Sequence, residues 1–178
     1  MKKDLESVMF DEKAIAAKVA ELGQQIARDY EGKDVVVVGI LNGAAVFFTD
    51  LIRQIKLPIN IDFIAASSYG DAAVSSGKVN IKKDLNKDIA GRHVLLVEDI
   101  IDSGITMSNL MAILNERKPA SVKLCALLSK PSRRQVDVKI DYCGFEVPDE
   151  FLVGYGLDYA EKYRNLPVIG VLKREIYS

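Results

Sequence analysis

Residues 94–106 read VLLVEDIIDSGIT, and this stretch decides the fold. An apolar strand ends in two adjacent acids, Glu98 and Asp99, and a third acid, Asp102, follows two isoleucines. The run Ser103-Gly104-Ile105-Thr106 then stands where a helix is expected to begin. A strand that turns directly into a helix is typical of α/β sheets, whose ligands bind at the carboxyl ends of the strands.

The residue types in this turn predict a site for a sugar phosphate. A helix start offers unpaired backbone N–H groups and the positive end of the helix dipole, and the hydroxyls of Ser103 and Thr106 add donors for a phosphate. Gly104 allows a ligand to approach closely. The adjacent acids suit the hydroxyls of a cis-diol or a hydrated Mg²⁺. Acids that merely cap the helix are the alternative, but that reading leaves the coincidence of three acids with a hydroxyl-glycine run unexplained.

Strands and helices alternate on both sides of this turn. Apolar residues spaced by three and four predict a helix over 11–30, a second around residues 47–55 and a third from Met107 to Leu114. Short apolar runs predict strands, which we place at 34–40, 59–66, 93–99 and 121–128, with shorter pieces at 138–145, 151–153 and 167–172. This order predicts a central parallel sheet with helices on both faces, formed by residues 1–178 as a single domain.

The composition excludes several classes of protein. With 24 basic and 25 acidic residues the net charge is −1, which argues against binding nucleic acid through bulk positive charge. No apolar run approaches the length of about 20 residues that crosses a membrane. The two cysteines, Cys125 and Cys143, fit neither a zinc site nor a disulfide framework. We therefore expect a soluble, cytoplasmic protein without a membrane or nucleic-acid partner.

Residues 67–80 (SSYGDAAVSSGKVN) lack any helical or strand period. A loop of this length in a small domain is usually either functional or disordered, and its composition does not decide between the two. The sequence contains neither the Gly-Lys-Ser/Thr element of a nucleoside-triphosphate loop nor the G-x-G-x-x-G of a dinucleotide fold.

Several motifs together resemble one family. VLLVEDIIDSGIT looks like the phosphoribosyl-diphosphate signature of the phosphoribosyltransferases, and its Ile100-Ile101 doublet is similar to the 6-oxopurine branch, the hypoxanthine-guanine phosphoribosyltransferases. The other matching segments follow in the family's order: Leu41-Asn42-Gly43-Ala44, Ser68-Tyr69, Lys130, GFEVPD at 144–149, the run 151–158, and Arg164. The resemblance covers about residues 10–175.

The resemblance implies a fold, a reaction and an assembly. The fold is the type I phosphoribosyltransferase fold, with a small hood made by the terminal segments and a flexible lid loop at about residues 67–80. The reaction is a purine salvage step, in which phosphoribose passes from 5-phosphoribosyl 1-diphosphate to hypoxanthine or guanine to give IMP or GMP and diphosphate. Mg²⁺ is the implied cofactor, and a homodimer or homotetramer is the implied assembly.

For the sugar, phosphate and metal, the resemblance implies the following roles. Glu98 and Asp99 hold the ribose hydroxyls and one Mg²⁺, and residues 102–106 (Asp102, Ser103, Gly104, Ile105 and Thr106) bind the 5′-phosphate. Asp158 is a ligand of a second Mg²⁺, and Arg164 clamps the diphosphate. Leu41, Asn42 and Gly43 form the diphosphate loop, which in the family has a cis peptide bond. Many relatives carry a basic residue where this chain has Asn42, so only the backbone role carries over.

For the base, Asp102 is implied to act as general base or acid at N7 of the purine. Lys130 donates to the 6-oxo group, which disfavours adenine because adenine presents a donor there. Phe151 stacks on the purine, and the backbone of Leu152 meets its edge. Ser68 and Tyr69, in the lid, close over the reacting carbon and exclude water.

Two alternatives remain open at this point. Xanthine is a possible base, because Leu152 acts through its backbone. A regulator that senses phosphoribosyl diphosphate without turnover uses the same fold, but it has no need for Asp102, Lys130 and Arg164 together. Among other residues, we interpret His93 as structural and Arg133 and Arg134 as a solvated turn. The apolar stripe of Phe47, Phe48 and Leu51 fits either core or interface.

Overall fold

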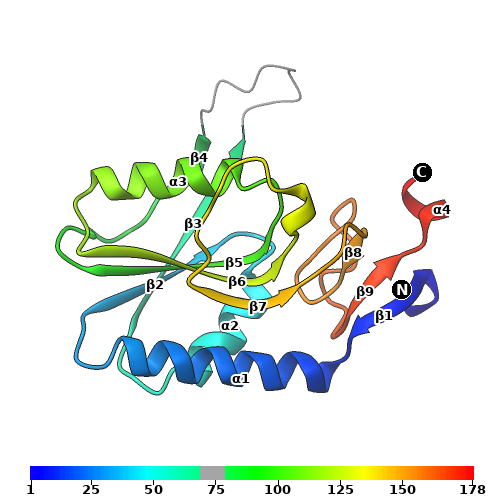
Figure 1. Cartoon of the computed structure of the whole chain (residues 1–178), viewed down its shortest axis with the longest axis horizontal. Helices are drawn as coiled ribbons and strands as arrows, with labels where there is room; N and C mark the ends of the chain where they lie inside the picture. Colours follow the sequence, from blue (N-terminus) through cyan, green and yellow to red (C-terminus); the bar gives the residue numbers. More distant parts are fainter. Residues whose placement is uncertain (69–78) are drawn as a thin grey trace.

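The structure, a computed structural model, describes residues 1–68 and 79–178. Its centre is a six-stranded sheet with the order β4-β3-β2-β5-β6-β7 (Figure 1). Five of its strands run parallel to one another: β2 (Val35–Ile40), β3 (Asn60–Ser68), β5 (His93–Ile101), β6 (Ser121–Ser129) and β7 (Tyr142–Glu146). The sixth strand, β4 (Val79–Lys83), pairs with β3 in the antiparallel direction.

One edge of this sheet adds an antiparallel strand to the predicted parallel sheet. Ser67 pairs with Asn80 and Ser68 with Val79, so the ends of the segment 67–80 form a hairpin and are not loop. Backbone pairing extends both strands into a segment whose Ser- and Gly-rich composition gave no strand signal. The rest of the expected lid, residues 69–78, lies outside the described residues.

Helices cover both faces of the sheet, as predicted. α1 (Glu12–Asp29) and α2 (Ala45–Gln54) lie on one face and α3 (Ile105–Glu116) on the other (Figure 1). α1 begins where Oδ1 of Asp11 accepts a hydrogen bond of 2.8 Å from the backbone N–H of Ala14, a side-chain cap of the usual kind.

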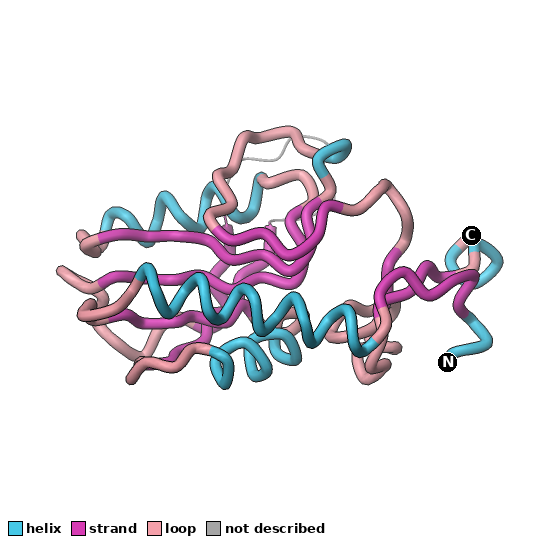
Figure 2. The backbone as a smooth tube through the Cα atoms, turned by 60° about the horizontal axis from the view of Figure 1, so that its bottom comes forward, coloured by secondary structure: helices cyan, strands magenta, loops and turns pink. Residues whose placement is uncertain are grey.

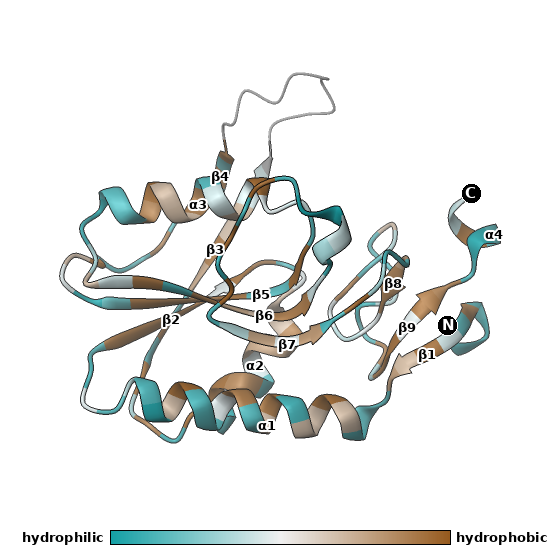
Figure 3. Ribbon diagram, in the orientation of Figure 1, coloured by the Kyte–Doolittle hydropathy of each residue, from teal (hydrophilic) through white to brown (hydrophobic). Residues whose placement is uncertain are grey.

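Strand β2 shows why a strand that is covered on both faces is apolar throughout. Val35 and Val37 pack in the core beneath α1 and α2, whereas Val36 and Val38 pack in the core beneath α3. Successive strand residues point to opposite faces, so a strand covered on both sides needs apolar residues at every position. Figure 3 shows this as hydrophobic colour along most of β2.

The apolar stripe of α2 belongs to the core. Phe47, Phe48 and Leu51 are each 0 % exposed within the single chain, where they pack against α1 and the sheet. They are therefore buried in the isolated chain and are not available as an interface between copies.

A second, smaller sheet joins the two ends of the chain. β1 (Leu5–Phe10) pairs antiparallel with β9 (Ile169–Leu172), which pairs in turn with β8 (Leu152–Val153). A 3-10 turn (Lys2–Asp4) precedes β1, and the short helix α4 (Arg174–Tyr177) follows β9. Both termini lie at this end of the molecule (Figure 2), which confirms the hood expected from the terminal segments. β1 was not predicted.

The strand expected over 138–145 begins only at Tyr142. The preceding residue, Asp141, accepts a hydrogen bond of 2.9 Å from the backbone N–H of Leu124 through its carboxylate. The backbone N–H of Leu124 is therefore not free to bond to the backbone of a longer β7. Strand pairing starts one residue later, at Tyr142.

The strand order places a switch point between β2 and β5. The connection after β2 leads outward through α2 to β3, and the connection after β5 leads the opposite way through α3 to β6. Ligands of open α/β sheets bind where neighbouring strands diverge in this way, at their carboxyl ends. In the described part of the chain, no helix is both long and apolar enough to span a bilayer.

Candidate active site

The turn after β5 presents the start of α3. Gly104 adopts φ 82°, and α3 begins at the next residue, Ile105. A Cβ at position 104 would lie 2.6 Å from the carbonyl oxygen of Val136, so glycine is required here by both conformation and space. The hydroxyl of Ser103 accepts a hydrogen bond of 3.3 Å from the N–H of Ile105. The turn thus places backbone N–H groups and hydroxyls at a helix N-terminus.

Residues 134–136 support this turn from behind. Nε of Arg134 donates to the carbonyl oxygen of Asp102 at 3.1 Å, and its Nη2 donates to the Ser129 hydroxyl at 2.9 Å. The carbonyl oxygen of Ser103 accepts from the N–H groups of Gln135 and Val136. The interpretation of Arg134 as a solvated side chain was wrong: it is half-buried and holds the turn.

Strand β5 is longer than predicted and runs to Ile101, so Glu98 and Asp99 lie within it. Because neighbouring strand residues face opposite sides, these two acids point into different hollows. Removal from water raises the pKa of both carboxyls, and the charge of Asp99 raises that of Glu98 further. Two acids held in this way favour a cation or a hydrogen-bond donor beside them.

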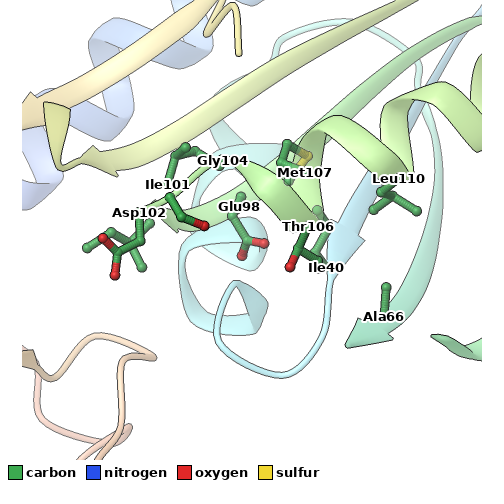
Figure 4. Close-up of a pocket in the computed structure, with 11 residues that line it drawn as sticks. Ile40, Ala66, Glu98, Ile101, Asp102, Gly104, Thr106, Met107 and Leu110 are labelled. Carbon is green, nitrogen blue, oxygen red and sulfur yellow. The ribbon is translucent and has the colours of Figure 1, made fainter. Parts of the chain in front are cut away.

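The first hollow lies between α3 and the end of the sheet (Figure 4). In that view the oxygen atoms of Glu98, Asp102 and Thr106 border the open space, and Ala66 of β3 lies across from them. The lining residues are Ile40, Ala66, Glu98, Ile100, Ile101, Asp102, Ser103, Gly104, Thr106, Met107 and Leu110. The polar side of this hollow is therefore formed by Glu98 and the turn 102–106.

The second hollow lies on the other side of the strand end. It is lined by Asp99, Ile100, Asp102, Lys130, Phe151, Leu152, Leu157 and Asp158. Both hollows share Ile100 and Asp102. A ligand that filled both hollows would contact Ile100 and Asp102.

Two of the lining side chains have distinct surroundings. Lys130, 9 % exposed, follows the last residue of β6, and its N–H donates to the carbonyl oxygen of Ile101 at 2.9 Å. The ring of Phe151 stacks on Tyr177 of α4, with centroids 4.5 Å apart, and meets Tyr159 edge-on. The sequence analysis missed Tyr177, because α4 is short and carries no helical signal, and it gave no role to Tyr159.

The turn after β2 packs against the acids of β5. The peptide bond between Leu41 and Asn42 is cis, and Asn42 is exposed. A Cβ on Gly43 would overlap with the carboxylate of Asp99, and a Cβ on Gly156 would overlap with the carbonyl oxygen of Gly43. Close backbone approach through these glycines joins three segments of the chain at one point.

The segment 154–166 carries the last two predicted residues, Asp158 and Arg164. Nη1 of Arg164 lies 3.1 Å from Oδ1 of Asp158 and donates to the carbonyl oxygen of Gly156 at 2.8 Å. Oδ2 of Asp158 accepts from the N–H of Glu161 at 2.9 Å. The positive charge of Arg164 also acts on Asp99, whose pKa it lowers against the effect of burial. The two residues therefore stand beside the β5 acids.

A sequence profile of the phosphoribosyl transferase domain matches residues 8–160, most of the chain. The chain belongs to the phosphoribosyltransferase family. Its relatives agree with this assignment. It is 51% identical over 178 residues to the hypoxanthine-guanine phosphoribosyltransferase of Bacillus subtilis, covering all of this chain and 99% of the relative. A crystal structure of a hypoxanthine phosphoribosyltransferase from Staphylococcus aureus superposes with a TM-score of 0.97 at 47% identity, covering 100% of this chain and 97% of the other.

Some relatives are much longer. The chain is 52% identical to the bifunctional protein TilS/HprT of Listeria monocytogenes over 100% of its own length, but it spans only 28% of that protein. The match therefore identifies this phosphoribosyltransferase domain as one part of a larger relative.

The phosphoribosyltransferase family uses a metal ion in catalysis, and the acids of this member fit one. In residues 1–68 and 79–178, no three acidic, His or Cys side chains gather around one point, which excludes an all-protein cage there. Mg²⁺ commonly binds through one or two carboxylates and completes its shell with water and substrate oxygens. The half-buried pair Glu98 and Asp99, and Asp158 beside Arg164, supply carboxylates of this kind.

The remaining predicted residues of this phosphoribosyltransferase are distributed as follows. Ser68 is the last residue of β3, and Tyr69 lies outside the described residues. His93 stands at the opposite end of β5 from the site, where its Nδ1 and the Ser121 hydroxyl are 2.7 Å apart, as expected of a structural histidine.

Proposed function

We propose that the chain transfers the phosphoribosyl group of 5-phosphoribosyl 1-diphosphate to hypoxanthine or guanine, a purine salvage reaction that gives IMP or GMP and diphosphate. The proposal assigns this activity to residues 1–178 as one domain. It rests on the family and on the names of relatives such as the Bacillus subtilis enzyme, which is similar over the full chain.

One observation carries the proposal: two hollows with different chemistry meet at Asp102. The first ends in a helix N-terminus with hydroxyls, which suits a phosphate. The second contains a buried lysine and an aromatic ring, which suit a flat base with a carbonyl group. A nucleoside monophosphate has the same order, with phosphate and base on either side of the ribose.

For the sugar phosphate, the N–H groups and hydroxyls of residues 103–106 bind the 5′-phosphate. Glu98 and Asp99 accept hydrogen bonds from the ribose hydroxyls, and their position on the strand between the hollows favours this role. Residues 134–136, which support the turn, keep these donors in place before the substrate arrives.

For the base, Lys130 donates to the 6-oxo group and so favours oxopurines over adenine. Asp102 accepts the proton at N7 as the glycosidic bond forms. Phe151 stacks on one face of the purine while its other face rests on Tyr177, and the backbone of Leu152 meets the edge of the base.

For the leaving group, the backbone of Leu41, Asn42 and Gly43 and the guanidinium of Arg164 hold the diphosphate. Departure of this group leaves positive charge on the anomeric carbon, so fixed donors around the diphosphate stabilise the transition state more than the ground state. Arg164 is held ready by Asp158 and the Gly156 carbonyl.

The metal of this site is Mg²⁺. Glu98 and Asp99 hold one ion, directly or through water, and Asp158 holds a second. When bound, Mg²⁺ offsets the negative charge of the diphosphate. The paired carboxyls support the choice, because hard oxygen donors of this kind suit Mg²⁺ better than softer metals.

The proposal places the enzyme in the cytoplasm as a homodimer or homotetramer. Cys125 and Cys143 are both unpaired in the described part of the chain, as is usual in a reducing compartment. Light scattering coupled to size exclusion distinguishes dimer from tetramer.

Steady-state turnover tests the function. The assay contains phosphoribosyl diphosphate and Mg²⁺ with hypoxanthine, guanine, xanthine or adenine, and it includes the Asp102→Asn variant. We expect turnover of hypoxanthine or guanine, reduced by about 100-fold or more in the variant. Turnover of only xanthine or adenine would contradict the role of Lys130. Binding of phosphoribosyl diphosphate without turnover of any base would indicate a sensor.

A further inference from the structure

Four charged side chains of alternating sign form a connected chain of charges beside the second hollow, where the proposed function places the base. Nζ of Lys130 lies 3.9 Å from Oδ1 of Asp149, and Oδ2 of the same carboxylate lies 3.6 Å from Nη1 of Arg133. Nε of Arg133 lies 3.3 Å from Oδ1 of Asp102. The chain thus connects the two groups that the proposed function places on the 6-oxo group and N7 of the base.

The backbone fixes the spacing of this chain. Lys130 precedes the 3-10 turn Pro131–Arg133 and Arg133 ends it, and the N–H of Arg133 donates to the carbonyl oxygen of Lys130 at 3.1 Å. The segment that carries Asp149 is tied to the end of β6 where the N–H of Val147 donates to the carbonyl oxygen of Ser129 at 2.9 Å. Lys130, Arg133 and Asp149 are therefore presented together by two connected strand ends.

Only the two end members of this chain of charges line the second hollow. Lys130 and Asp102 are lining residues, whereas Arg133 and Asp149 are not among them. The side chain of Lys130 is 11 % exposed, whereas those of Asp102, Arg133 and Asp149 are 47 %, 54 % and 51 % exposed. Arg133 and Asp149 therefore face solvent and contact the substrate-binding groups from outside.

The two inner groups depend on these outer partners. In the described residues, Asp149 is the carboxylate that forms an ion pair with the buried Lys130 ammonium. In the same described residues, Oδ1 of Asp102 is buried and forms no hydrogen bond, and the cation that pairs with it is Arg133. A lysine ammonium on a flexible stem is poorly directed unless a partner limits its rotamers.

We infer that Asp149 and Arg133 are positioning residues, which set the direction of Lys130 and Asp102 toward the base before it binds. The inference rests on the proposed function. The guanidinium of Arg133 contacts Asp102 through Nε and Asp149 through Nη1, and a lysine at this position has a single nitrogen for both tasks. The interpretation of Arg133 as merely solvated is replaced by this role.

The test compares KM and kcat for wild type, Asp149→Asn, Asp149→Glu, Arg133→Met and Arg133→Lys, with Glu150→Gln as control. Glu150 is an exposed acid beside Asp149 that lies outside the chain of charges. We expect Asp149→Asn to raise the KM for hypoxanthine about fivefold, with the KM for phosphoribosyl diphosphate changed less than about twofold. Asp149→Glu restores most of the affinity, and Glu150→Gln behaves as wild type.

Arg133→Met is expected to lower kcat about fivefold, because Asp102 loses its cationic neighbour, and Arg133→Lys recovers only part of this loss. In the double variant Asp149→Asn/Arg133→Met, the loss in kcat/KM is smaller than the product of the two single losses, since both substitutions remove the same bridge. Equal changes in the KM of both substrates, or multiplicative effects, would overturn the inference.

The outcomes separate this inference from the function on which it rests. If wild type turns over hypoxanthine and the variants match it in KM and kcat, the inference fails and the function stands. If wild type turns over no 6-oxopurine, the proposed function fails and the inference fails with it.

Discussion

The hydroxyl of Tyr155 donates a hydrogen bond of 2.6 Å to Oδ2 of Asp50. Tyr155 belongs to the segment that carries Asp158 and Arg164, and Asp50 lies in α2, the helix that follows the turn 41–43. Burial and this bond to a carboxylate raise the pKa of Tyr155, so the hydroxyl keeps its proton and remains a donor. One hydrogen bond therefore connects the two sides of the proposed diphosphate site.

Tyr155→Phe removes this connection with little change of shape. We expect the KM for phosphoribosyl diphosphate to rise about three- to tenfold, because the two segments are no longer fixed to each other, with a smaller change in the KM for the base. Tyr142→Phe is the matched control, since the hydroxyl of Tyr142 donates a hydrogen bond of 2.6 Å to Oδ2 of Asp29 at the other end of the sheet. Both variants lose stability, and only Tyr155→Phe changes the kinetics. Identical kinetics in the two variants would contradict the prediction.

Gly43→Ala introduces a methyl group where the carboxylate of Asp99 lies. We expect turnover to fall by about 100-fold, because the shift displaces an acid placed against the ribose and the metal. Gly32→Ala is the contrast. Gly32 adopts φ 74° with open space around it, so its substitution costs about 1 kcal/mol of stability through backbone strain. Thermal unfolding and steady-state kinetics should separate the two effects, and a Gly43→Ala enzyme with normal turnover would refute the close approach.

The fold was largely predictable because its central strands are buried on both faces. The uninterrupted run DVVVVGI and the spacing of apolar residues in α1 follow directly from what each element packs against. β1 and β4 escaped prediction for different reasons. β1 (LESVMF) lacks the alternation of apolar and polar residues and pairs with β9, which lies near the other end of the chain. β4 is short and pairs with the adjacent β3 beside a Ser- and Gly-rich segment that carries no strand signal.

The site was predictable where chemistry and sequence are local, as in the turn 102–106. The supporting residues were not. Arg134, Tyr177 and Asp50 act on groups that are distant in sequence, and an exposed-looking arginine or a terminal tyrosine carries no local signal of such a contact. Only the three-dimensional arrangement shows which charged or aromatic side chains support the site.

Glu98→Gln tests the raised pKa of the β5 acids. An acid whose pKa is raised on folding binds its proton more tightly in the folded state, so its contribution to stability falls as pH rises above the ordinary Glu value of about 4.5. We therefore expect the substrate-free variant to melt at a higher temperature than wild type at pH 7.5, with this gain shrinking toward pH 5. Thermal unfolding across this range measures it, and a variant less stable than wild type at pH 7.5 would contradict the prediction.

For Asp62 we expect the opposite pH dependence of stability from that of Glu98. Burial by itself raises its pKa, but hydrogen bonds from the N–H of Phe63 and from two residues after β4 outweigh burial and leave the pKa lowered. Its contribution to stability is present at neutral pH and is lost as pH falls through the lowered value. Asp62→Asn should cost about 1–3 kcal/mol at pH 7 and less in acid, the reverse of Glu98→Gln.

Tyr177→Ala removes the ring on which Phe151 stacks. The two rings lie 4.5 Å apart and are inclined by only 22°, so Tyr177 limits the ring positions open to Phe151. An aromatic pair contributes about 0.5–1.5 kcal/mol, which corresponds to a rise of about two- to twelvefold in the KM for hypoxanthine. The KM for phosphoribosyl diphosphate should stay within about twofold of wild type, because its proposed contacts lie on other segments. Tyr177→Phe keeps the ring and should restore the KM for the base. A Tyr177→Ala enzyme that binds hypoxanthine normally would show that Phe151 needs no support from α4.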